Sequence, residues 1–142
     1  MRSNRARSRT SIARRGTVLL CWTGLSLLAM ALGGCGFGRT PESAVSGFYH
    51  AVEENNITEA KTFLSATLIG LIPDAKLSAG LSSASQEIRQ CGGIKAIDTQ
   101  LSGEENVRKG RSTLTFKGQC PPKSDGVKLV KEDGKWKLAP DK

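Results

Sequence analysis

The chain has 142 residues, of which 38% are hydrophobic, and its 21 basic and 13 acidic residues give a formal net charge of +8. Six arginines and no acid lie in the first 15 residues, so the chain from residue 35 onward carries 15 basic and 13 acidic residues, a net charge of only +2. The basic character therefore does not indicate a nucleic-acid-binding protein. The residues after 34 suffice for one domain with a single core.

Residues 1–34 have the order of an export signal, with an arginine-rich start followed by an apolar run from about Thr17 to Leu32. The run is shorter than the ~20 apolar residues of a membrane-spanning helix. It ends in Leu32-Gly33-Gly34-Cys35. This tetrapeptide resembles the lipobox of bacterial lipoprotein precursors.

The lipobox resemblance implies that residues 1–34 are removed and that Cys35 becomes a lipidated first residue, carrying acyl chains such as palmitate. Two acyl chains suffice for stable membrane residence. Residues 35–39 would then be a short tether to a domain over residues 40–142. We expect a location in the bacterial cell envelope, on a membrane facing the periplasm or exterior. Gly36 favours the outer membrane if the cell has two.

The alternative to a lipoprotein is a plain secretory signal or an uncleaved anchor in which Cys35 is incidental. In either case Cys91 and Cys120 would face an oxidising compartment, which predicts a disulfide between them. Such a bond would stabilise the fold by about 3.5 kcal/mol. A metal site is not expected, because it needs more than two ligands and His50, the one histidine, is distant in sequence. A redox motif would need Cys-x-x-Cys, which is absent.

Three helices are predicted in the first half of the domain. Residues 40–52 begin with a capping threonine and a proline, and their apolar residues share one helical face. Asn56 and Glu59 form a capping box for a second helix over residues 57–68. A third, weaker helix is expected over residues 77–88, where a glycine and several serines lower helix propensity.

The second half has the composition of β-strands. Residues 94–102 and 111–117 are predicted strands, with a turn at residues 103–106. A hairpin centred near residue 105 pairs residues whose numbers sum to about 211. Cys91 and Cys120 would then face each other across its open end, which is a second argument for the disulfide.

A last hairpin joins residues 127–131 to 135–138 through Asp133-Gly134, which favours a type I′ turn. Its register places Leu129 opposite Leu138. Helices followed by about four antiparallel strands predict an α+β fold with the helices packed on one face of the sheet.

The motifs Thr40-Pro41-Glu42, Phe48 to Val52, Asn55 to Ala60 and Leu129 to Leu138 together resemble small lipoprotein domains of unknown function. These domains belong to the nuclear-transport-factor-two-like (cystatin-like) superfamily. The resemblance covers nearly all of residues 40–140, although the family commonly has Gly-Asp where Asn55-Asn56 stand here. It implies a curved antiparallel sheet wrapped around a helix as a cone, often with a pocket.

Tyr49 and Asp98 are the candidate pocket residues. Tyr49 lies on the apolar face of its helix, where core packing is favoured over catalysis. Asp98 is an acid within the first strand, on the face opposite Ile97. His50 lies off the apolar stripe and is expected at the surface. The sequence has no Ser/His/Asp, Cys/His, paired-carboxylate or phosphate-loop pattern, so no catalytic residue, cofactor or metal is assigned.

Arg108, Lys109 and Arg111 begin the second strand, in a half of the chain (residues 89–142) with a net charge of +5. They are either a solvated hairpin end or a contact with anionic headgroups or acidic envelope polymer.

The leading interpretation is a non-enzymatic envelope lipoprotein whose domain binds a small apolar ligand, a peptide or a protein partner. One alternative is a pocket enzyme of the isomerase or cyclase type that uses Tyr49 or Asp98. Another is a structural module that forms a homodimer, since sheets of this superfamily often pair face to face.

Overall fold

The computed structural model describes residues 40–141. The predicted signal peptide, Cys35 and the tether lie outside the described residues. Residues 40–141 belong to one compact unit. In the part of the chain that the structure describes, no helix is long and apolar enough to cross a membrane.

Four helices come first: α1 (Pro41–Glu53), α2 (Ile57–Thr62), α3 (Ala66–Leu71) and α4 (Asp74–Gln90). The start of α1 is confirmed, because Thr40 Oγ1 accepts the Ser43 N–H at 3.1 Å and Ser43 Oγ accepts the Thr40 N–H at 3.0 Å. The capping box of α2 is confirmed too. Asn56 Oδ1 accepts the Glu59 N–H at 3.2 Å, and the Asn56 amide donates to the Glu59 carboxylate at 2.8 Å.

The prediction of one helix over residues 57–68 is wrong, because the chain leaves the helix after Thr62 to pair with the sheet. Leu64 forms a parallel bridge with Leu138. The Leu138 N–H donates to the Phe63 carbonyl at 2.7 Å, and the Ser65 N–H donates to the Leu138 carbonyl at 2.8 Å. These bonds satisfy backbone groups that a continuous helix would have used itself.

The third predicted helix, over residues 77–88, is present and extends further at both ends. It corresponds to α4, which has 17 residues and is the longest helix described. Leu81, Ser85 and Ile88 are buried on one side of it. Packing of this face outweighs the low propensity of its glycine and serines.

Four antiparallel strands follow in the order β1-β2-β3-β4. They are β1 (Ile94–Ser102), β2 (Val107–Phe116), β3 (Lys123–Glu132) and β4 (Lys135–Ala139). Both predicted registers are confirmed, since Ile97 lies opposite Leu114 and Leu129 lies opposite Leu138. The prediction placed the starts of β2 and β3 four residues too late.

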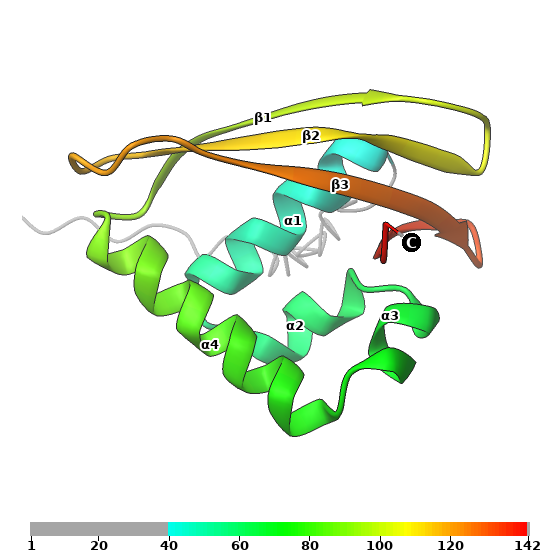
Figure 1. The fold of residues 1–142 in the computed structure, drawn as a ribbon, viewed down its shortest axis with the longest axis horizontal. Helices are drawn as coiled ribbons and strands as arrows, with labels where there is room; N and C mark the ends of the chain where they lie inside the picture. Colours follow the sequence, from blue (N-terminus) through cyan, green and yellow to red (C-terminus); the bar gives the residue numbers. More distant parts are fainter. Residues whose placement is uncertain (1–39, 142) are drawn as a thin grey trace, which may run out of the picture. The chain divides into compact units, whose positions relative to one another are not determined.

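The helices pack on one face of the sheet, as Figure 1 shows, and the predicted α+β class is confirmed. Val45 of α1, Leu114 of β2 and Leu129 of β3 are at most 2% exposed and form the centre of the core. Each of these residues lies on a side of its element that the sequence pattern marked as apolar.

The predicted disulfide between Cys91 and Cys120 is present, with 5.5 Å between the two Cα atoms. Cys91 caps α4, and Cys120 lies in the loop between β2 and β3. The ladder shifts between Ile94 and Ala96, so the cysteines meet beyond the regular hairpin. The bond fastens the end of α4 to the chain just before β3.

Candidate functional site

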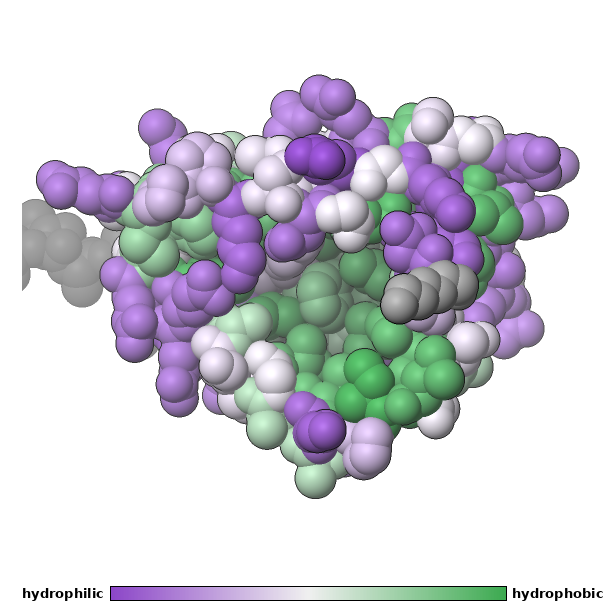
Figure 2. All heavy atoms as spheres, viewed as in Figure 1, coloured by the Kyte–Doolittle hydropathy of each residue, from purple (hydrophilic) through white to green (hydrophobic). Residues whose placement is uncertain are grey.

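A cavity of about 120 Å³ lies between α1, α4 and the inner face of the sheet. Figure 2 shows an apolar hollow between the sheet and the helices. The residues that line the cavity are Phe48, Tyr49, Val52, Leu81, Ala84, Glu87, Ile88, Leu114, Phe116, Lys123 and Asp125.

The walls of the cavity are apolar because three elements present their buried faces to it. Leu81, Ala84 and Ile88 recur at the spacing of one face of α4. The rings of Phe48 and Tyr49 on α1 meet edge to face, with centroids 5.3 Å apart. Ala84 has the smallest side chain among the lining residues, so the α4 wall projects least at that point.

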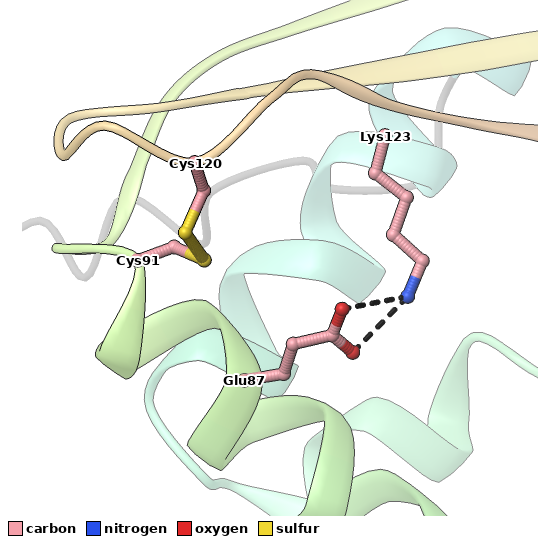
Figure 3. The surroundings of a disulfide bond; sticks show 4 residues. All are labelled: Glu87, Cys91, Cys120 and Lys123. Carbon is pink, nitrogen blue, oxygen red and sulfur yellow. Dashed lines mark hydrogen bonds and ion pairs between the residues drawn. A yellow bond between two sulfur atoms is a disulfide. The ribbon is translucent and has the colours of Figure 1, made fainter.

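An ion pair lies at the polar side of the cavity. Lys123 Nζ of β3 donates to both carboxylate oxygens of Glu87 on α4, at 3.1 Å each (Figure 3). The side chains are 48% and 54% exposed. A pair this exposed contributes at most about 1 kcal/mol. Like the disulfide, the ion pair links α4 to the chain at the start of β3. It is weak enough for its two side chains to separate readily.

Tyr49 and Asp125 supply a hydrogen-bond donor and an acceptor to this apolar space. Burial raises the pKa of the Tyr49 phenol to about 12, and the negative charge of Asp125 raises it in the same direction. The hydroxyl therefore stays protonated at neutral pH and can donate a hydrogen bond. The carboxylate of Asp125 can accept one.

Of the two predicted pocket residues, the structure places only Tyr49 at the cavity. Asp98 is exposed on the face of β1 opposite Ile97, and its partner across the ladder is Thr113. The acids that line the cavity are Glu87 and Asp125. Asp125 was missed because β3 starts before the predicted strand. Counting back two residues from Val127 places Asp125 on the buried face.

The predicted cluster of Arg108, Lys109 and Arg111 is divided between the two faces of β2. The Arg108 guanidinium points to the helix side and donates to the Gly103 carbonyl. Lys109 lies on the other face, 3.6 Å from the carboxylate of Asp141. Arg111 shares that outer face and borders a shallow depression. These residues therefore do not form one patch.

His50 lies outside the cavity. His50 is 49% exposed, and its Nδ1 lies 3.5 Å from the carboxylate of Glu53. Among residues 40–141, no group of three or more His, Cys, Asp or Glu side chains is arranged to hold a metal ion.

The fold is similar to that of a Campylobacter jejuni protein described as a candidate NTF2-like transpeptidase. The two chains are 16% identical with a TM-score of 0.60, over 72% of this chain and 99% of that one. A cystatin-fold protein of Novosphingobium aromaticivorans, itself uncharacterised, is 9% identical with a TM-score of 0.40, over 70% and 96% of the two chains.

No protein-family model matches the chain, and no curated protein matches it in sequence. The likeness to the Campylobacter jejuni protein shows an NTF2-like α+β fold. At such low identity the likeness shows a fold and assigns no activity.

Proposed function

We propose that this protein is a lipid-anchored envelope lipoprotein whose domain binds a small, mainly apolar ligand without chemically changing it. The apolar cavity of about 120 Å³ is the observation that supports ligand binding. An apolar cavity of about 150 Å³ binds benzene in another protein. The space here therefore suits a single ring or the end of an acyl chain. The lipobox-like segment ending at Cys35 supports the anchor.

The polar groups at the cavity narrow the chemistry of the ligand. Tyr49 offers a donor and Asp125 an acceptor, so a hydroxyl group on an apolar body satisfies both. Leaving the two polar groups unpaired would cost about 1–3 kcal/mol. We therefore expect p-cresol to bind better than toluene, which has the same ring without the hydroxyl.

The test compares p-cresol binding, measured by NMR titration, between a variant whose cavity is filled and a control variant. Ala84→Leu places three more carbons in the space and should abolish binding. Ala79→Leu is the matched control, because Ala79 is exposed on the same helix and does not line the cavity. Equal binding by both variants would contradict the proposal.

The anchor is tested separately by expressing the full chain with labelled palmitate. We expect label on the wild type and none on the Cys35→Ala variant. Incorporation by both would contradict an anchor at Cys35.

A second candidate is a pocket enzyme of the isomerase type. It is favoured by the joint presence of Tyr49 and Asp125 in the cavity, because a donor and a base facing one bound group can move a proton. Turnover lost in both Tyr49→Phe and Asp125→Asn, with ligand affinity kept, would support it.

We do not propose a transpeptidase activity for this protein. Acyl transfer needs an activated nucleophile, whereas Cys91 and Cys120 are bonded to each other and His50 does not line the cavity.

A further inference from the structure

The helix α3 presents an apolar surface that the fold does not cover. None of its six residues is buried. Leu71 is 65% exposed and Ile69 is 40% exposed, which makes them two of the three large hydrophobic side chains described as exposed. No charged residue occurs from Leu64 to Pro73. This uncharged turn with two exposed aliphatic side chains is a candidate contact surface for an apolar partner.

The apolar surface of α3 is held in place by several hydrogen bonds. The Ala66 N–H donates to the Glu132 carboxylate at 3.1 Å, and Ser65 Oγ accepts the Leu68 N–H at 3.1 Å. The strand-like bond of Ser65 to Leu138 precedes them. These bonds tie the start of α3 to β4 and to the β3–β4 hairpin.

Lysines lie on the β3–β4 hairpin, which pairs with the segment just before α3. The neighbouring β3–β4 hairpin carries Lys131, Lys135 and Lys137, and Lys137 reaches across to donate to the Thr62 carbonyl at the end of α2. The same hairpin carries two acids, Glu132, which accepts the Ala66 N–H of α3, and Asp133 at its turn. Aliphatic side chains beside lysines have the chemistry of a surface that enters an anionic lipid headgroup layer.

The position of the anchor indicates which surface α3 can contact. Only four residues lie between Cys35 and Thr40, so the domain begins within about 18 Å of a lipidated Cys35. In Figure 1 the start of α1 lies against the sheet and α3 lies on the opposite side of the domain, both toward the same end of the sheet. We propose that α3 inserts its apolar side chains into the headgroup layer of the anionic bilayer that carries the anchor. This proposal rests on the anchor of the proposed function for proximity, although its test does not.

The test uses the chain from residue 36 onward, which includes residues 40–141 of the compact unit and lacks any lipid. Its one tryptophan is Trp136, which is 6% exposed and gives a constant background. In Leu71→Trp, we expect emission to shift to shorter wavelength with vesicles of phosphatidylethanolamine and phosphatidylglycerol. Val107→Trp is the matched control, because Val107 is 37% exposed on β2 and should show no shift.

Affinity supplies a second measurement. Ile69→Ser with Leu71→Ser should weaken vesicle partitioning at least about tenfold, because two partly buried aliphatic side chains are lost from the lipid. Val107→Ser should leave it unchanged. Lys131→Gln with Lys135→Gln should weaken it, whereas Lys76→Gln with Lys95→Gln should not.

Three results would overturn the insertion of α3. One is equal emission shifts at positions 71 and 107, and another is partitioning that the serine variants leave intact. The third is a shift of Leu71→Trp that rises with protein concentration in the absence of vesicles, which would assign α3 to a contact between two copies of the chain. A loss of palmitate labelling would remove the anchor alone, because the vesicle measurements do not involve Cys35.

Discussion

Tyr49 has a raised pKa because its phenol is partly buried. Its ring packs against Phe48 and its hydroxyl shares the cavity with Asp125. Ionising the phenol there would place a second negative charge in an apolar space beside the first, so the neutral form is favoured. The chain contains one tyrosine, which makes this property directly observable.

We predict that the tyrosinate absorbance of the folded protein appears with a midpoint near pH 12, against about 10 in denaturant. The stability that Tyr49 contributes is complete below pH 10 and is lost as the pH rises from about 10 to 12, because the unfolded chain releases the proton first. The loss is on the order of 3 kcal/mol. Tyr49→Phe should remove this part of the pH dependence. A folded-state midpoint near 10 would contradict the burial of the phenol.

The positions of single side chains could be predicted where a helical period fixed them. Tyr49 lay on a complete apolar stripe, so its inward direction followed from the spacing. The acid of the cavity could not be found this way. Asp125 lies in a Ser-Asp-Gly stretch of low strand propensity, and pairing with β2 rather than local preference makes it a strand. Asp98, in a stretch that does read as a strand, faces away from the helices.

At the scale of elements, the pairing of β1 with β2 depends on a missing side chain. A Cβ atom on Gly110 would lie 1.9 Å from the carbonyl oxygen of Gln100. That oxygen belongs to the backbone of the neighbouring strand, so it cannot rotate away. The close approach of the two strands at this point therefore requires glycine.

We predict that Gly110→Ala lowers the free energy of unfolding by about 2–3 kcal/mol, because the strands must separate to admit the methyl group. Gly126→Ala is the control, since nothing lies within 4 Å of the Cβ position of Gly126 on β3. Urea denaturation of both variants measures the difference. Equal stability of the two would show that β1 and β2 are not in close contact at Gly110.

The hairpins could be predicted from local sequence. The break between α2 and α3 at residues 63–65 could not. Asp133-Gly134 fixes the β3–β4 turn and hence the register of that pair. The end of α2 is decided by Leu138, which lies more than seventy residues away along the chain. A pairing this distant leaves no trace in the local hydrophobic period, so a continuous helix was the natural prediction.

At the scale of the whole molecule, two links join α4 to the chain at the start of β3. One is the covalent bond of Cys91 with Cys120, and the other is the ion pair of Glu87 with Lys123 (Figure 3). Both lie at the cavity end of these elements. Their contributions differ because a disulfide restricts the unfolded chain, whereas an exposed ion pair is screened by water.

We predict that Cys91→Ser with Cys120→Ser lowers the free energy of unfolding by about 3.5 kcal/mol, given a sequence separation of 29 residues. Glu87→Gln should lower it by less than about 1 kcal/mol. Urea denaturation under non-reducing conditions measures both. Similar losses for the two changes would contradict the difference in mechanism.

Because Leu64 pairs with Leu138, the two edge strands of the sheet, β1 and β4, differ in how many of their backbone groups are left for pairing with another chain. Along β4, part of the border already has a neighbour that occupies its amide and carbonyl groups. Among residues 40–141, β1 pairs on one side only, with β2. An unpaired border is a template for strand addition. Growth of the sheet by a peptide or a second copy would therefore be directed to β1, in one direction only, and would leave the α3 side available.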